Sequence, residues 1–208
     1  MFTSKDKTEN IINLIWDRDE YYIVAAGNDA PSKKDVVNLA TKYGVKLPKD
    51  YIAHTIGEWG SPYLEVKEKF WPRHKAGDVG QFWSFLYGVF VFAYNEEAPD
   101  WMRIEIVAEE FKAMGHQVLP ILKVIGDADV YCFDSNGKIQ RWLHEGDIFE
   151  AFDGTFFDLL EYEFKELDER RKRKKAEPEG RLYGDPHIIL RATVLPTESH
   201  PIIVRQNK

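Results

Sequence analysis

Residues 130–142, with the sequence VYCFDSNGKIQRW, carry the pattern that decides the fold class of this chain. Two short runs rich in β-branched and aromatic residues, 130–134 and 138–142, flank the tripeptide Ser-Asn-Gly at 135–137. An Asn-Gly pair between two such runs is typical of a tight turn that joins antiparallel strands. This stretch therefore predicts a β-hairpin within a mostly antiparallel sheet.

Apolar runs upstream of the hairpin predict further strands. Residues 118–125 predict one strand, and residues 82–94, FWSFLYGVFVFAY, are apolar on both faces, as in a central strand covered from both sides. The second run is 13 residues long and contains Ser84 and Gly88. A helix needs about 20 apolar residues to span a bilayer, so we expect a buried strand here.

Helical spacing of apolar residues appears between and around these strands. Ser32 and Asp35 predict a capping box, and Pro48 suits the first position of a helix. We expect helices over 33–43, 48–59, 99–114 and 155–175. The order of helices and strands predicts an α+β fold: a single domain with a mostly antiparallel sheet packed with about four helices.

The same apolar stripes predict which side chains form the core. We expect the following to be mostly buried: Val36, Ala40, Ile52, Ile56, Trp59, Phe90, Phe92, Ile104, Phe111, Phe133, Leu160 and Phe164. We also expect core packing, rather than a ligand pocket, for Trp59, Trp83, Trp101 and Trp142, which fall at strand or apolar-face positions.

The chain contains no internal repeat and no low-complexity linker, so we expect one domain. Residues 32–175 form its predicted core. Residues 1–31 are an N-terminal extension with one helix and one strand. Residues 176–208 are a C-terminal extension, in which 187–195 could add an edge strand.

Composition limits the classes of function. The 208 residues carry a net charge of −7, which argues against a protein that coats nucleic acid and is compatible with a basic protein partner. Cys132 is the only cysteine, so no intramolecular disulfide forms, and a reducing, cytoplasmic compartment is expected. The first residues lack the order of a signal peptide, and we expect no membrane association.

The run RRKRKK at 170–175 has two interpretations. It could contact nucleic acid or act in targeting. Acidic residues precede it in the same predicted helix, however, so the helix is negative early and positive late, as its macrodipole favours. We therefore expect a dispensable helix end without core contacts.

Motifs for catalysis and metal binding are missing from the sequence. One cysteine and six histidines show no zinc spacing, and Asp127, Asp129 and Asp134 do not follow the order of a calcium loop. Cys132 lies in an apolar run, which favours a buried, inert thiol. We expect no cofactor, no metal and no catalytic residue, although the 35 acidic residues leave a hydrolase with a carboxylate pair open as an alternative.

Two segments resemble the SUKH superfamily, the domain of Smi/Knr-type cell-wall regulators and of many bacterial immunity proteins. The first is 32–51, which contains Leu-Pro-Lys-Asp-Tyr at 47–51 and leads to Glu-Trp-Gly at 58–60. The second is 126–147, with Gly-Asp, Phe-Asp, Gly-Lys, Trp and His-Glu in the family's order. The resemblance covers roughly 32–170. It implies a non-enzymatic α+β domain that in bacteria commonly neutralises a cognate toxin, often a nuclease.

We therefore expect a protein-binding module, of the immunity type, that neutralises a basic toxin domain. An adaptor of the Smi/Knr type is the alternative within the same fold. Acidic loop residues would meet the basic working face of a nuclease. The candidates for partner binding are Glu58, Asp127, Asp129, Glu145 and Asp147. The competing interpretation is that these five are ordinary turn and solubility residues.

Overall fold

The computed structural model describes residues 4–14, 18–25, 29–75 and 80–176. Its helices are α1 (Ser4–Asn13), α2 (Lys33–Lys42), α3 (Lys49–Thr55), α4 (Ile104–Ala113) and α5 (Phe156–Ala176), with 3₁₀ helices η2 (Phe82–Phe85) and η3 (Asp100–Met102). Its strands are β1 (Tyr21–Val24), β2 (Tyr63–Val66), β3 (Gly88–Val91), β4 (Leu119–Ile125), β5 (Val130–Phe133), β6 (Ile139–Leu143) and β7 (Ile148–Ala151).

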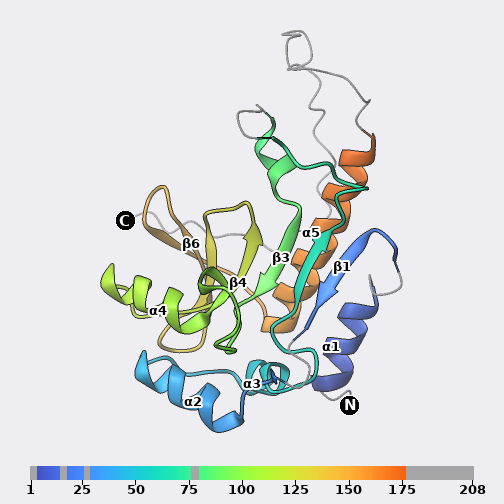
Figure 1. Cartoon of the computed structure of the whole chain (residues 1–208). Helices are drawn as coiled ribbons and strands as arrows, with labels where there is room; N and C mark the ends of the chain where they lie inside the picture. The colour runs from blue at the N-terminus through green and yellow to red at the C-terminus, as the bar shows by residue number, and fades with distance from the viewer. Residues whose placement is uncertain (1–3, 15–17, 26–28, 76–79, 177–208) are drawn as a thin grey trace.

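The strands form one seven-stranded antiparallel sheet in which spatial order equals chain order, from β1 at one edge to β7 at the other. α5 crosses one face of the sheet with α1 beside it, α4 lies on the opposite face, and α2 and α3 pack at one end (Figure 1). The expected α+β fold with an antiparallel sheet is confirmed. No helix among the described residues is long and apolar enough to cross a membrane.

The hairpin predicted from the Asn-Gly pair joins β5 and β6. Phe133 pairs with Ile139, and Gly137 takes a positive φ of 79° that suits glycine. A side chain at Gly137 would collide with the backbone oxygen of Lys46, because the turn packs against the segment that precedes α3. The capping box is also confirmed, since Ser32 and Asp35 bond reciprocally at the start of α2.

Three local expectations are wrong. Residues 82–94 do not form one strand: 82–85 form η2, and only 88–91 belong to the sheet. Gly88 marks the change, because a side chain there would collide with the backbone of β2. α3 ends at Thr55 rather than at residue 59, so Ile56 is 38% exposed and not core. The helix expected over 99–114 is divided into η3 and α4, and β7 is a further strand after the hairpin.

The core joins segments that are distant in the chain. Tyr51 of α3 meets Phe133 of β5 and Phe156 of α5 edge-on, with 5.0 Å between ring centroids in both pairs. Of the other expected core residues, Ile52 and Trp59 are only partly buried. The remaining expected core residues are buried: Val36, Ala40, Phe90, Phe92, Ile104, Phe111, Phe133, Leu160 and Phe164.

The described part of 1–31 packs into the same domain. β1 pairs with β2, and Ile11 and Ile12 of α1 belong to the hydrophobic core. The Thr8 hydroxyl lies 3.1 Å from Nδ1 of the buried His54 in α3. At the other terminus, the strand expected at 187–195 lies outside the described residues.

The basic run at 170–175 is not a free helix end, so that expectation is wrong. Arg170 and Arg171 are 8% and 7% exposed. Arg171 lies 3.3 Å from Glu20 and 3.1 Å from Asp168, and the Arg173 guanidinium lies over the Trp83 ring. α5 extends past its apolar stripe because two other segments contact the end of this helix. The chain around Glu20 contributes carboxylates, and η2 contributes an aromatic ring.

Candidate functional site

The β4–β5 loop and the β6–β7 loop meet at one end of the sheet. The His144 backbone N–H donates to Asp129 Oδ1 at 3.2 Å, and His144 Nδ1 lies 3.1 Å from the same oxygen. This contact brings four of the predicted partner-binding residues together, namely Asp127, Asp129, Glu145 and Asp147. Glu58 follows α3, which packs against the β5–β6 turn at the opposite end of the sheet, so the structure does not bring it to the other four.

Asp127 and Asp129 are already neutralised within the fold. Arg141 Nη2 lies 3.0 Å from a carboxylate oxygen of each. Burial opposes the charge on Arg141, but Tyr131, Asp127 and Asp129 hold its pKa above the usual value. Asp127 is 9% exposed, so this carboxylate offers little to a partner. Both aspartates stabilise the joined loops.

Asp147 also has a local role. Its Oδ1 accepts a hydrogen bond from Trp142 Nε1 at 2.8 Å and lies 2.6 Å from His116 Nε2. The bond from Trp142 is the main cause that lowers the pKa of Asp147. Asp147 has a positive φ of 49°, as expected of a turn residue held by its side chain. Glu145, by contrast, is exposed and has no ion pair among the described residues.

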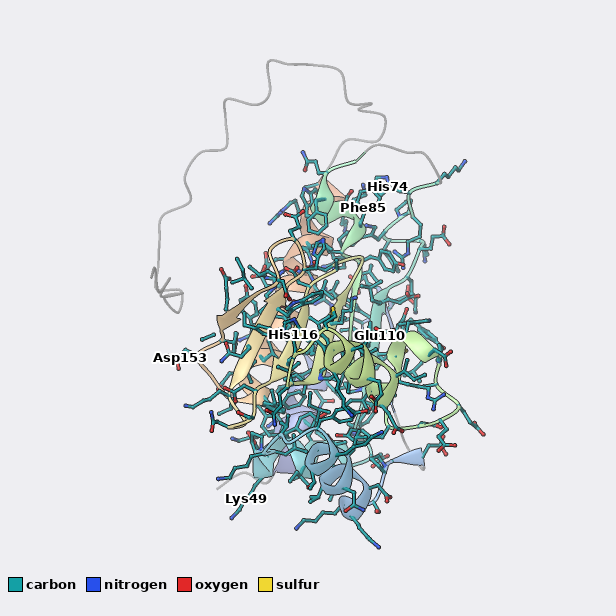
Figure 2. All side chains as sticks on the ribbon, turned by 90° about the vertical axis from the view of Figure 1, so that its left-hand side faces the viewer. Lys49, His74, Phe85, Glu110, His116 and Asp153 are labelled. Carbon is teal, nitrogen blue, oxygen red and sulfur yellow. The ribbon has the colours of Figure 1, made fainter. Side chains whose placement is uncertain are left out.

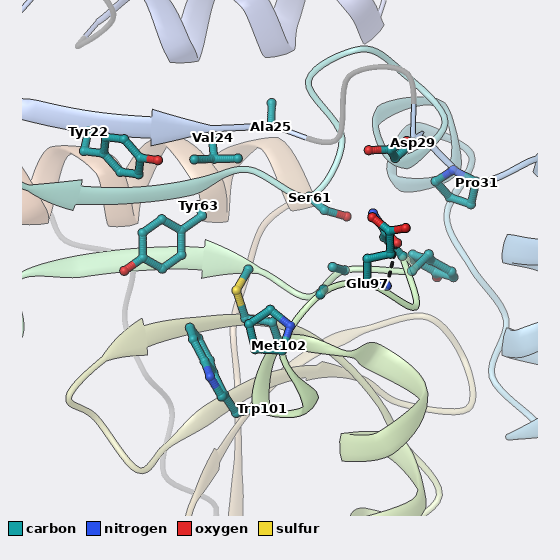
Figure 3. Close-up of a pocket in the computed structure, with 15 residues that line it drawn as sticks. Tyr22, Val24, Ala25, Asp29, Pro31, Ser61, Tyr63, Glu97, Trp101 and Met102 are labelled. Atoms are coloured by element: carbon teal, nitrogen blue, oxygen red, sulfur yellow. Dashed lines mark hydrogen bonds between the residues drawn. The ribbon is translucent and has the colours of Figure 1, made fainter.

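A second candidate site is a hollow of about 490 Å³ on the sheet face that also carries α4, but over β1–β3, where α4 does not reach. We call it the aromatic hollow and define it by seven of its lining residues: Tyr22, Val24, Asp29, Tyr63, Glu97, Trp101 and Met102 (Figure 3). It also includes parts of the segment 93–99.

Strand alternation creates the wall of the aromatic hollow. Successive side chains of β1 point to opposite faces, so Tyr21 is buried against α5 while Tyr22 and Val24 face the hollow. Val24 pairs with Tyr63, and Tyr63 pairs with Phe90, which extends the apolar row across β2 and β3. The row is therefore set by the register of three strands.

Trp101 completes the wall from a different element. It belongs to η3, and its ring packs edge-on against Phe90, with 5.2 Å between centroids, and against Tyr63 at 6.5 Å. Despite these contacts, Trp101 is 55% exposed, and Tyr22 is 52% exposed. The expected core packing of Trp101 is therefore wrong, because η3 ends before α4 begins and holds the ring outside the apolar face of that helix.

The Tyr63 ring is fixed by polar contacts at its far end. Its hydroxyl donates to Glu65 at 2.7 Å, and Glu65 lies 3.7 Å from Arg73. Burial, and then the Glu65 carboxylate, raise the pKa of Tyr63, so the hydroxyl stays protonated at neutral pH. The Arg73 guanidinium lies 3.6 Å from the Tyr87 ring centroid and completes this support. The wall is thus largely preformed.

Carboxylates border the aromatic hollow and a second hollow beside it. We call them the acidic rim: Asp29, Asp35, Glu96, Glu97 and Glu105. Among the described residues of the lining, the cations are Lys42 and Arg103.

Those two cations are engaged within the fold. Lys42 lies 2.7 Å from Glu105 and 2.9 Å from Glu109, and Arg103 lies 3.5 Å from Asp100. Within the described ranges, Asp29, Glu96 and Glu97 form no ion pair. The acidic rim therefore keeps uncompensated negative charge beside exposed aromatic rings.

Two titratable groups outside both hollows, Cys132 and His54, are buried. Cys132 is fully buried, which confirms that expectation, and burial raises the pKa of its thiol. Burial lowers the pKa of His54 to about 3, so this side chain is neutral. In the part of the chain that the structure describes, no three His, Cys, Asp or Glu side chains are grouped to hold a metal ion.

Sequence reasoning missed the aromatic hollow because it treated aromatic residues as core. One signal was present. Tyr21 and Tyr22 are neighbours in a predicted strand, so their side chains must point to opposite faces of the sheet, and both cannot be buried on the same face. No model of a protein family matches the chain, and no curated protein and no solved structure is significantly similar to it.

Proposed function

We propose that this chain is a protein-binding module that recognises a basic partner through the acidic rim and the aromatic hollow. The observation that carries the proposal is the placement of exposed Tyr22 and Trp101 beside the unpaired carboxylates of Asp29 and Glu97. Contiguous exposed apolar surface bordered by polar groups is typical of interaction sites, and tyrosine and tryptophan are enriched there. The net charge of −7 adds a long-range field that would steer a basic partner.

The class of partner that we propose is a toxin domain, and the role is that of an immunity protein that occludes it. The resemblance of 32–51 and 126–147 to the SUKH superfamily supports this role. A nuclease that grips phosphates carries lysine and arginine on its working face, and the acidic rim is complementary to such a face. Occlusion is stoichiometric and needs no catalytic residue in this chain.

The five predicted partner-binding residues divide into those engaged within the fold and those that keep exposed carboxylates. Asp127 and Asp129 share Arg141, and Asp147 accepts a hydrogen bond from Trp142, so all three carboxylates are engaged within the fold. Glu58 and Glu145 keep exposed carboxylates, yet neither lines the aromatic hollow. We therefore propose the acidic rim as the main recognition surface and keep Glu145 as the test of the loop alternative.

The test compares charge reversals on different surfaces. The wild type, Glu97→Lys, Glu145→Lys and Asp153→Lys are immobilised and exposed to extract of the cell of origin. Asp153 is exposed in the β7–α5 loop, with no ion pair among the described residues, and lies far from Glu110 of α4 in Figure 2. It supplies the matched control. The captured protein is then produced alone, tested for toxicity, and titrated against each variant by calorimetry.

We expect a one-to-one complex that suppresses the toxicity of the partner. Glu97→Lys should weaken it about tenfold or more at low salt, whereas Asp153→Lys should not. A partner whose binding is weakened only by Glu145→Lys would move the site to the β6–β7 loop. A harmless partner would replace the immunity role with that of an adaptor, and turnover of the partner would contradict a binding module.

A further inference from the structure

The aromatic hollow has two chemically different ends. Tyr22, Tyr63 and Trp101 lie at one end, whereas Asp29 and Glu97 lie at the other, with Met102 beside the aromatic end (Figure 3). An occupant that fits both ends must be apolar along its length and positively charged at its tip. The arrangement of apolar and charged groups in the hollow therefore restricts the chemistry of the occupant more than the volume of the hollow does.

Lysine and arginine side chains have this combination of properties. Their methylene stems lie readily on apolar surfaces while their charged heads remain in polar surroundings. A wholly apolar side chain would desolvate Asp29 and Glu97 without giving them a partner, and a phosphate would be repelled by both carboxylates.

The strand next to the hollow favours an extended segment as the carrier of that side chain. β1 is an edge strand, and the Lys67 N–H donates to the Glu20 carbonyl at 2.7 Å. Because hydrogen-bonded pairs alternate in an antiparallel ladder, Tyr22 and Val24 also bond to β2, and the N–H and C=O of Ile23 point outward. Exposed strand edges bind extended peptides by backbone pairing.

We infer that the aromatic hollow binds a lysine or arginine side chain carried by an extended segment of the partner protein. The stem lies against Tyr63 and Trp101, and the head lies between Asp29 and Glu97. Residues of the segment on either side pair with the outer edge of β1, which no other described strand covers. This inference rests on the proposed function and adds the chemistry of the partner's recognition element.

The experiment uses a probe rather than the native partner, so its outcome does not depend on the capture experiment. The probe is a short capped peptide in which lysine alternates with valine, and its counterpart carries N-acetyl-lysine at the same positions. Acetylation keeps the stem and removes the charge. Comparison of the two peptides therefore separates the contribution of the acidic end of the hollow to affinity from that of the aromatic end. Binding is followed by ¹⁹F NMR of the chain labelled with 5-fluorotryptophan, with the Trp101 signal assigned from Trp101→Phe.

Titration of the lysine peptide should shift the Trp101 signal and leave the Trp142 signal, far along the sheet, in place. Acetylation should weaken binding about tenfold, the loss expected for one charge-assisted contact, and Asp29→Asn with Glu97→Gln should do the same. Asp153→Asn is the matched control and should leave affinity unchanged. Trp101→Ala should weaken both peptides, because it removes the wall for the stem.

Equal affinity for the two peptides, or binding that leaves the Trp101 signal unmoved, would overturn the inference. So would a captured partner whose affinity is insensitive to Trp101→Ala and to the Asp29 and Glu97 substitutions. That result would keep a protein-binding module but remove the acidic rim and the aromatic hollow as its recognition surface. Conversely, selective binding of the lysine peptide together with failure to find any partner would support the inference and remove the proposed function.

Discussion

The Tyr21 hydroxyl donates a hydrogen bond to Asp168 Oδ1 at 2.6 Å and joins the first strand to the last helix across 147 positions of sequence. Arg18 approaches the same oxygen at 2.7 Å, and Arg171 at 3.1 Å. Although burial opposes the charge, these hydrogen bonds hold the pKa of Asp168 well below its usual value. Asp168 is therefore the anion that fixes β1, and with it one wall of the aromatic hollow, onto α5.

Replacement of Asp168 by Asn should lower the free energy of unfolding by about 2–4 kcal/mol, because the partly buried guanidinium groups lose their counter-ion. Urea denaturation measures this loss, and Asp153→Asn, which removes an exposed carboxylate, should change stability by less than about 0.5 kcal/mol. Similar losses in the two variants would show that Asp168 does not organise the contact.

The contribution of Asp168 should also depend on pH in a defined direction. Its folded pKa is depressed, so the stabilisation is complete above the unfolded pKa near 4 and is lost as pH falls through the folded pKa. Between neutral pH and strongly acidic pH, the wild type should therefore lose more stability than Asp168→Asn. Parallel stability curves for the two proteins would contradict this assignment.

His54 should make the protein less stable at moderately acid pH. Burial lowers its folded pKa to about 3, whereas in the unfolded chain it titrates near 6.5. Below pH 6.5 the unfolded chain takes up a proton that the folded chain does not, so stability falls with pH. Between pH 7 and about pH 4.5, the wild type should lose roughly 2–3 kcal/mol more than His54→Gln. Chemical denaturation at both pH values measures this, and an equal loss would indicate an accessible imidazole.

The basic end of α5 should divide into structural and dispensable charges. Arg171→Gln should cost about 2 kcal/mol, because Glu20 and Asp168 lose a nearly buried partner. Lys175→Gln removes an exposed charge from the same helix and should cost only a few tenths. Thermal denaturation distinguishes them, and equal melting temperatures would restore the view of a free helix end.

Two phenylalanines within the run 82–94 should differ strongly in how much stability the same substitution removes. Phe92 is 1% exposed, so Phe92→Ala should cost about 3–5 kcal/mol through lost transfer free energy and a cavity. Phe82 is 62% exposed, and Phe82→Ala should cost less than about 1 kcal/mol. A loss under about 1 kcal/mol at Phe92 would show that it is not core.

Local patterns predicted much of the fold. The Asn-Gly turn, the capping box at Ser32 and the stripe of α5 each depend on residues a few positions apart, and each is present. The boundaries that failed depend on distant partners. The break in 82–94 follows from the close approach of β2 to Gly88. The exposure of the Ile56 side chain follows from the early end of α3.

The candidate site was less predictable than the fold. The loop acids Asp127, Asp129 and Asp147 were correctly placed in loops, but the sequence does not show that Arg141, His144 and Trp142 already bind them.

By itself, then, the sequence determined the α+β class, the central hairpin, the net negative charge and most of the buried apolar residues, because these depend on local periodicity and composition. Only the tertiary structure decided which charges remain unpaired and which aromatic rings remain exposed. Tyr22 and Trp101 are of residue types common in protein cores, and Arg171 is of a type common at the surface. Their positions are reversed because burial depends on which distant element covers a side chain: the chain around Glu20 covers Arg171, while α4 stops short of β1–β3.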